Sequence, residues 1–359
     1  MIFDFWGEFG GSLSSNFALS AIGIQKKGEQ ADYSCLLSPP HSATPETMFR
    51  VASISKIVTG QVAVRAARRA GLNHPFATDV SDILGYRLRH PRHPQRVITL
   101  GMLASHQAGL TDDGGYLLPP EATLEDWLSN QPVWTDTEPG TRFDYCNLGY
   151  LLLAACAEAM SGRHFGDLSA ELLSELGIHG GFNWYGVADR TDRIATFRKG
   201  GGELTAQIDA TVSVSGPSLP DGSEASLSHY RLGCNPTVFS PQGGLRTNLV
   251  GITRLASAVG EGRFDTRALW QPDSGETVGP QGVFESYGMG LQIYDRPRFY
   301  PRPLIGHFAE AYGFFGGAFW DQERQTAFAF GFNGEPEGVG NDFRPEELRT
   351  FELVAKMLA

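Results

Sequence analysis

The chain is poor in two residue types that mark particular classes of protein. Only four of its 359 residues are cysteine. They are too far apart for a metal site and too few for a disulfide-stabilised scaffold, so we expect mostly buried thiols. The four are Cys35, Cys146, Cys156 and Cys234. Lysine is also scarce, at five residues, and the formal net charge is -11. Nucleic acids and anionic membranes bind basic surfaces, so we expect neither as a partner.

The chain also lacks the long hydrophobic runs that are typical of membrane spans and signal peptides. No apolar stretch reaches the 18 residues of a membrane span, and the most apolar helical stretch, residues 148–160, is too short. Residues 1–6 do not have the basic segment, apolar core and cleavage site of a signal peptide. We therefore expect no membrane span and a cytoplasmic protein, or a periplasmic one if a leader has been removed.

What the sequence does contain is enough apolar material for a large core, with 41% hydrophobic and 11% aromatic residues. Near the start, strand-like runs at residues 17–25 and 33–37 flank a Lys26-Lys27-Gly28 turn and predict a hairpin, with no evident helix before it. The signals are mainly helical over residues 61–181. Residues 189–235 are rich in Gly, Ser, Thr and Asp, which predicts loops and short strands.

The C-terminal part alternates between helix and strand signals. A helical stretch covers residues 245–258, and residues 346–358 carry apolar side chains at helical spacing, so this last helix should cover one face of a sheet. Four strand-like runs lie between them: residues 287–294, 304–312, 314–320 and 326–332.

We predict an α/β fold of the α+β type, in which both ends of the chain share one antiparallel sheet of five or more strands flanked by helices. The predicted sheet domain comprises residues 1–65 and 185–359, and a mainly helical subdomain, residues 66–184, is inserted between them. The active site is expected in the cleft between the two parts.

The strongest indication of chemistry is a Ser-x-x-Lys at Ser53 and Lys56, in the apolar stretch of residues 48–58. Residues three apart on a helix share a face, so the hydroxyl and the amine can lie side by side. Apolar neighbours would desolvate the lysine, lower its pKa and allow the neutral amine to accept the serine proton. The alternative is a surface lysine on a helix that Ser53 caps, because the motif by itself is weak.

Two further groups of residues support the chemical interpretation. Tyr145 and Asn147 lie two apart before the apolar helix, where a phenol could relay protons and an amide could bind substrate. The competing interpretation is a buried tyrosine and a helix-capping asparagine. His307 lies on a predicted strand, where a lone histidine is more often structural.

The order Ser-x-x-Lys, Tyr-x-Asn and strand histidine resembles the serine β-lactamase and penicillin-binding-protein superfamily. It is most similar to the class C-like branch, with its related esterases and D-aminopeptidases. Flanking phrases at residues 48–53, 98–110, 139–140, 235–245 and 287–290 follow the order of that family. The resemblance spans nearly the whole chain and implies a β-lactamase or transpeptidase-like fold.

The resemblance also implies roles for individual residues. Ser53 would be the acylated nucleophile, Lys56 its proton acceptor, and Tyr145 a second acid/base group that delivers a proton to the leaving group. Asn147 and His307 would bind substrate, and the backbone N–H groups of Ser53 and Glu310 would form the oxyanion hole. No cofactor and no metal are expected.

Several neighbouring residues are expected to play no chemical part. Ser105 and His106 would mark a helix end, His90 and His93 a loop, and Ser55 points about a hundred degrees away from the Ser53 face. The sequence departs from the family pattern in two places. Ala309 replaces a glycine of the strand motif, where its methyl and the bulk of Phe308 would crowd a fused β-lactam ring, and Cys146 replaces the commoner serine.

The resulting hypothesis is a serine hydrolase that cleaves an ester, amide, β-lactam or small peptide-like bond through an acyl-enzyme on Ser53. His307 and Ala309 favour an esterase or aminopeptidase. The alternative is a catalytically inactive penicillin-binding-like domain for ligand binding or sensing. A Ser-His-Asp hydrolase is disfavoured because the chain has no Gly-x-Ser-x-Gly, and a nucleotide enzyme because it has no P-loop or spaced-glycine motif.

Overall fold

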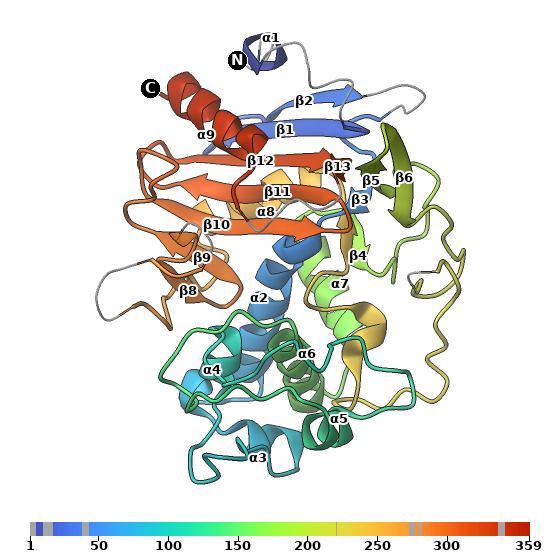
Figure 1. Ribbon diagram of the computed structural model, residues 1–359, viewed down its shortest axis with the longest axis vertical. Coiled ribbons are helices and arrows are strands. Elements are labelled where there is room, and N and C mark those ends of the chain that lie inside the picture. Colours follow the sequence, from blue (N-terminus) through green and yellow to red (C-terminus); the bar gives the residue numbers. More distant parts are fainter. Residues whose placement is uncertain are drawn as a thin grey trace.

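The computed structural model describes residues 5–9, 17–37, 43–219, 221–272, 277–279, 282–336 and 342–359. Its main feature is a seven-stranded antiparallel sheet in the order β2-β1-β12-β11-β10-β9-β8, so an N-terminal and a C-terminal strand pair within it, next to its β2 edge (Figure 1). The strands are β1 Leu19–Lys26, β2 Asp32–Leu37, β8 Ser286–Gly288, β9 Leu291–Tyr294, β10 Leu304–Ala311, β11 Phe314–Asp321 and β12 Thr326–Asn333.

The central strands are apolar on both faces because helices cover both faces. Every residue of β11 and β12 is buried. The final helix, α9 Pro345–Met357, packs Phe351 and Val354 on the phenylalanines of one face. Helix α8, Leu249–Gly260, covers the other face. This layering confirms the predicted fold class and the predicted place of the last helix (Figure 1).

A tight turn fixes the register of the two strands that border the site. Tyr312 and Gly313 connect β10 to β11, with φ angles of 59° and 95°. Positive φ at both central residues is typical of a two-residue hairpin turn whose twist matches that of the strands. The turn pairs Ala311 with Phe314, and Glu310 therefore lies opposite Phe315.

The other half of the molecule is mainly helical, as predicted for residues 61–181. Helix α2, Ser55–Arg69, packs against the apolar helix α6, Leu148–Ser161. Figure 1 shows the short helices α3 Val80–Leu84, α4 Leu100–Ala104 and α5 Leu124–Asn130 near this pair, away from the sheet. The remaining helices are α1 Phe5–Phe9 and α7 Phe165–Glu175, with 3-10 turns η2 Ala52–Ile54, η3 Pro75–Ala77 and η4 Pro236–Phe239.

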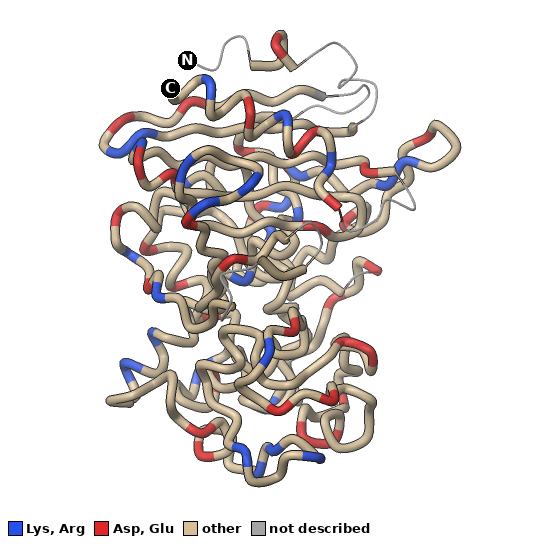
Figure 2. The backbone as a smooth tube through the Cα atoms, turned by 60° about the vertical axis from the view of Figure 1, so that its left-hand side comes forward, with Lys and Arg blue, Asp and Glu red and all other residues tan. Residues whose placement is uncertain are grey.

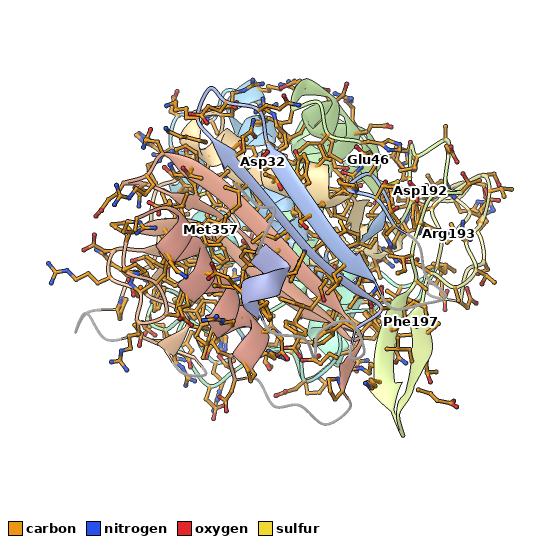
Figure 3. The ribbon with its side chains drawn as sticks, turned by 90° about the horizontal axis from the view of Figure 1, so that it is seen from above. Asp32, Glu46, Asp192, Arg193, Phe197 and Met357 are labelled. Atoms are coloured by element: carbon orange, nitrogen blue, oxygen red, sulfur yellow. The ribbon has the colours of Figure 1, made fainter. Side chains whose placement is uncertain are left out.

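Two small sheets complete the fold. One contains β3 Phe49–Arg50, β7 Leu245–Thr247 and β4 Gly180–Phe182, and the other contains β13 Glu335–Pro336, β5 Thr196–Gly200 and β6 Glu203–Ile208. Seen from above, the β5–β6 hairpin projects from the body of the molecule beyond Phe197 (Figure 3). Asn333 of β12 accepts a hydrogen bond from the Phe197 N–H at 2.8 Å, which ties the hairpin to the main sheet.

Most of the predicted elements are confirmed, including the N-terminal hairpin and the four strand-like runs. Three details were wrong. A short helix, α1, precedes the hairpin. The run at residues 287–294 is split at Met289 and Gly290, whose positive φ angles turn the chain between β8 and β9. Residues 245–247 form strand β7 before α8 begins.

The four cysteines are all free thiols. Cys146 and Cys156 are buried as expected, whereas Cys35 and Cys234 are only half-buried. No helix in the described parts of the chain is long and apolar enough to cross a membrane. Acidic and basic positions are interspersed along the chain rather than gathered on one side (Figure 2).

A glycine contact holds α2, which carries the lysine of the Ser-x-x-Lys, against the β8–β9 turn. A Cβ added to Gly60 would lie 2.1 Å from the Met289 carbonyl oxygen. We expect Gly60→Ala to lower the free energy of unfolding by about 1–3 kcal/mol, since the backbones must separate. Urea denaturation measures this.

The control is Gly149→Ala in α6, whose Cβ would meet only the Leu103 carbonyl oxygen, at 3.8 Å. It should leave stability unchanged or raise it by about 0.5–1 kcal/mol, through helix propensity. Equal effects of the two substitutions would contradict the close-packing argument.

Candidate active site

Ser53 lies in a short 3-10 turn between strand β3 and helix α2. The turn covers Ala52–Ile54, and α2 begins at Ser55. The expectation that Ser53 is part of the helix itself was therefore wrong. The 3-10 turn has three residues per turn and still brings positions three apart to one side. Ala52, just before the serine, has a φ of 45°, a left-handed conformation that costs an alanine about 1–2 kcal/mol.

The lysine amine is completely enclosed and touches three oxygen atoms. Lys56 has no exposed surface. Its Nζ lies 3.1 Å from Ser53 Oγ, 2.8 Å from Asn147 Oδ1 and 2.9 Å from the Gln242 carbonyl oxygen. The alternative of a surface lysine beside a capping serine is therefore wrong.

The surroundings of the amine change its acidity. Burial lowers the pKa of Lys56 to about 7, although the Asp112 carboxylate and the Cys146 thiol act to raise it. Near neutral pH a large fraction of the amine is therefore unprotonated. A neutral amine can donate to Asn147 and Gln242 and accept the Ser53 proton with its lone pair.

Asn147 is held in place by a carboxylate at the start of α6. Asp112 accepts hydrogen bonds from the backbone N–H groups of Asn147 and Leu148, at 2.9 and 3.0 Å. It also accepts one from Asn147 Nδ2, at 2.8 Å, which turns the amide oxygen towards Lys56. Asn147 stands at the N-cap position but makes no capping hydrogen bond with its side chain. Asp112 performs the capping that the competing interpretation assigned to Asn147.

The Tyr145 phenol joins the same group. Its ring lies beside the amine, with Lys56 Nζ 4.8 Å from the ring centroid. Burial raises the pKa of Tyr145 well above its ordinary value, and the hydrogen bond with Ser53 lowers it only in part. The phenol is thus protonated at neutral pH and can act as a proton donor.

His307 lies in the wall of the site with both ring nitrogens engaged. Nδ1 donates to the Phe308 carbonyl oxygen, and Nε2 accepts a hydrogen bond from the Tyr287 hydroxyl at 2.9 Å. Burial and the nearby Lys56 lower the pKa of His307 to about 3, so the ring is neutral. Its role in substrate binding stays a prediction, and it supplies no positive charge there.

The backbone N–H of Glu310 points to the side of β10 away from β11. The N–H of Phe308 leaves β10 on the side away from β11, because it donates to Gln292 Oε1 of β9 at 2.8 Å. N–H groups two residues apart leave a strand on the same side, so that of Glu310 points beyond the end of β9. Turn η2, which carries Ser53, contacts β10. This geometry is compatible with the predicted oxyanion hole.

A cavity of about 370 Å³ opens over these groups, and we call it the Ser53 cavity. Ser53, Tyr145 and His307 line it. Its other lining residues are Val283, Phe284, Gln292, Phe308, Ala309, Glu310, Asp342, Phe343, Arg344 and Glu347. Ala309 is buried in this wall. The Phe308 ring packs against Phe351 of α9 and lies 4.8 Å from the Phe319 ring centroid, and the residue also lines the cavity.

The residues expected to play no chemical part take structural positions. Ser105 ends α4 and donates to the Gly101 carbonyl oxygen. His90 binds the Thr135 carbonyl oxygen in a loop, and Ser55 accepts the Leu245 N–H. His106 accepts the Cys146 N–H at 3.1 Å and stacks near Tyr145. The described residues contain no His, Cys, Asp and Glu group that could hold a metal ion.

Sequence reasoning did not identify Asp112, Gln242 or Tyr287 as parts of the site. Asp112 follows the phrase at residues 98–110, and the other two lie inside the family-like phrases at residues 235–245 and 287–290. Their function comes from contacts across the fold, with Asn147, Lys56 and His307. No local pattern predicts those contacts.

Known proteins resemble this chain in sequence and in fold. The family model described as Beta-lactamase matches residues 21–349. Penicillin-binding protein 4 of Amycolatopsis lactamdurans is 26% identical over 144 residues, which is 38% of this chain and 36% of that protein. A putative fimbrial assembly protein FimD of Dichelobacter nodosus is 27% identical over 151 residues, 40% of this chain and 36% of that protein. The alignments thus span about a third of each curated relative.

Solved structures match over most of their length. A D-amino acid amidase from Ochrobactrum anthropi SV3 has a TM-score of 0.69 at 15% identity, covering 95% of this chain and 92% of that one. A β-lactamase/D-alanine carboxypeptidase from Yersinia pestis has a TM-score of 0.67 at 15% identity, covering 96% and 95%. A D-stereospecific amidohydrolase from Streptomyces sp. has a TM-score of 0.64 at 16% identity, covering 89% and 90%. These likenesses show the fold.

Asp112 offers a test of how the site is held together. We expect Asp112→Ala to lower the free energy of unfolding by about 1–2 kcal/mol, because N–H groups at the start of α6 lose their acceptor. The reaction of Ser53 with a fluorophosphonate should slow, because the Asn147 amide is no longer oriented. Its half-maximal pH should also fall, since the Asp112 charge acts to raise the pKa of Lys56.

The matched control is Asp113→Ala, at the exposed neighbouring carboxylate. It should change neither stability nor the reaction of Ser53. A loss of stability in Asp112→Ala with an unaltered rate and pH profile would show that Asp112 is only a helix cap.

Proposed function

The chain belongs to the beta-lactamase family, and from this premise we propose that it is a serine hydrolase that forms an acyl-enzyme on Ser53. The observation that carries the proposal is the buried Lys56 amine, 3.1 Å from Ser53 Oγ and with its pKa lowered to about 7. Serine is a poor nucleophile at its ordinary pKa and needs an adjacent base. The neutral amine is that base.

In the proposed acylation, the Ser53 proton passes to Lys56 Nζ as Oγ attacks the substrate carbonyl carbon. The developing oxyanion accepts hydrogen bonds from the N–H groups of Ser53 and Glu310. Tyr145 then donates its phenolic proton to the leaving group as the bond to the carbonyl carbon breaks. The ammonium of Lys56, beside the Tyr145 ring, returns a proton to the phenol. Acylation ends with Lys56 neutral and Tyr145 protonated.

In the proposed second half of the reaction, water replaces the leaving group. Lys56 is again the available base, because the raised pKa of Tyr145 keeps its phenol protonated. Water loses a proton to Lys56 and attacks the ester carbonyl carbon. The bond to Ser53 Oγ breaks, and the proton returns to the serine.

The size and lining of the Ser53 cavity favour small esters, amides or peptide-like substrates over fused bicyclic β-lactams. Its volume is about 370 Å³, and buried Ala309 occupies the β10 position where the family pattern has glycine. Two structures of similar fold are described as a D-stereospecific amidohydrolase and a D-amino acid amidase. We propose that this chain cleaves a bond of the same general kind.

The alternative function is an inactive domain that binds or senses a ligand. The arrangement of Ser53, Lys56, Tyr145 and Asn147 argues against it, because a binding domain does not need a desolvated amine beside a serine. We therefore place hydrolysis first.

Mass spectrometry of the intact protein after incubation with a fluorophosphonate tests the proposal. We expect one covalent adduct on the natural chain, formed by attack of Ser53 Oγ on phosphorus with loss of fluoride. The adduct should be absent from Ser53→Ala. Ser129→Ala, at an exposed serine of α5, is the control and should be labelled normally. A natural chain that takes up neither the fluorophosphonate nor penicillin would support the inactive domain.

The pH dependence of labelling tests the role of Lys56. Ser53 can pass its proton only to the neutral amine, so the rate should be low at pH 5, half-maximal near pH 7 and constant above pH 8. Lys56→Ala should lower the plateau by at least about a hundredfold. Lys356→Ala, at an exposed lysine, should keep the natural profile. A profile with its midpoint near pH 10 would show that Lys56 is an ordinary amine and not the base.

A further inference from the structure

A second cavity, of about 550 Å³, lies beyond the turn end of β10, and we call it the Arg50 cavity. Its lining is largely apolar and includes Leu118, Leu219 and Val238. Arg50 and Tyr312 also line it. The proposed reaction makes no use of this space.

Arg50 is a buried cation without a partner that satisfies it. Only 6% of the surface of Arg50 is exposed. Among the described residues it has no hydrogen-bond acceptor and no carboxylate within ion-pair distance, and its Nε is buried without a partner. The guanidinium instead makes a cation–π contact with the Tyr312 ring, whose centroid lies 4.8 Å from the guanidinium carbon. A buried unpaired charge is costly, which indicates that an anion is missing.

A neighbouring buried arginine, Arg246, has the hydrogen-bond partners that Arg50 lacks in the described part of the chain. Arg246 makes two hydrogen bonds to Asp209, both at 3.0 Å, and another to Asn183. Asp209 is thus already paired, and the cluster of Arg50, Arg246 and Asp209 has one excess positive charge. Burial and the nearby Arg246 lower the pKa of Arg50 only to about 10, so it is a cation at neutral pH.

The guanidinium lies next to the reacting groups. Arg50 precedes Ser53 by three residues, and Nη2 would lie 3.3 Å from a Cβ added to Gly243. The adjacent Gln242 carbonyl oxygen binds Lys56 Nζ. Tyr312 follows Glu310 of the predicted oxyanion hole by two residues. The backbone at Gln242 and Gly243 therefore lies between the Arg50 guanidinium and the Lys56 amine.

The position of Tyr145 decides which part of a substrate enters the Arg50 cavity. Tyr145 lines the Ser53 cavity, and in the proposed function it protonates the leaving group. This role for Tyr145 assigns the leaving group to the Ser53 cavity and leaves the Arg50 cavity, lined by Tyr312, for the acyl chain. We propose that Arg50 binds a carboxylate at the far end of the substrate's acyl chain, so that the preferred substrates are esters or amides whose acyl group is an apolar chain ending in a carboxylate. This inference rests on the proposed function.

Two acidic residues line the Arg50 cavity, but they do not prevent a carboxylate from binding at Arg50. Glu121 and Glu224 are both exposed, and Glu224 accepts a hydrogen bond from the Ser215 hydroxyl. Both are exposed to solvent, whereas Arg50 is buried. Water screens their charge more than it screens the charge of the arginine.

Matched esters test the proposal. The 4-nitrophenyl monoesters of adipate and suberate are compared with the 4-nitrophenyl esters of hexanoate and octanoate, which have the same chain lengths and no carboxylate. The measured quantity is the ratio of kcat/KM for the charged ester to kcat/KM for the neutral ester of the same length. For at least one length, Arg50→Gln should lower this ratio by about tenfold or more, because one charged hydrogen bond is lost. Arg163→Gln, at an exposed arginine, should leave the ratio unchanged.

A second variant guards against misfolding. Tyr312→Asn removes the ring over the guanidinium but suits the left-handed turn, and it should lower the same ratio by a smaller factor. An unchanged ratio at both lengths in Arg50→Gln and Tyr312→Asn would overturn the inference while the hydrolase stands. The ester 4-carboxyphenyl hexanoate carries its carboxylate on the leaving group. If Arg50→Gln instead lowers kcat/KM for this ester relative to 4-nitrophenyl hexanoate, the assignment of the carboxylate to the acyl chain is overturned. Failure to cleave any ester, together with unlabelled Ser53, would overturn the proposed function itself.

Discussion

The burial of one amine is the constraint on which the rest of the site depends. Lys56 can lie in the interior only because three oxygen atoms, two of them from distant parts of the chain, surround its Nζ. Each comes from a different element: the 3-10 turn before α2, the start of α6 and the loop before β7. Their convergence lowers the cost of burying the amine, while the loss of water favours its neutral form. Folding and chemical reactivity therefore rest on the same contacts.

The layered sheet gives this arrangement its rigidity. Strands β11 and β12 are buried over their whole length, and they hold β10 beside turn η2, which carries Ser53. The two-residue turn after β10 sets the register, and with it the direction of the Glu310 N–H. The same turn places Tyr312 over Arg50. One hairpin thus contributes to the lining of both the Ser53 cavity and the Arg50 cavity.

Much of the fold could be predicted because its elements have strong local signals. The apolar runs of β10, β11 and β12 and the one-sided last helix follow from the periodicity of their side chains. Helix α1 was not predicted because five residues are too few for a periodic signal. The turn at Met289 and Gly290 was not predicted because methionine rarely takes a positive φ.

The sequence by itself determined the chemical groups, since Ser53, Lys56, Tyr145 and Asn147 stand in short motifs with family-like order and spacing. Only the tertiary structure decided their state. Asp112 orients Asn147 from 35 residues away, and Gln242 reaches Lys56 from 186 residues away. Desolvation, and with it the pKa of Lys56, depends on everything that surrounds the amine in space. Such contacts are fixed by packing, so the spacing of residues along the chain does not encode them locally.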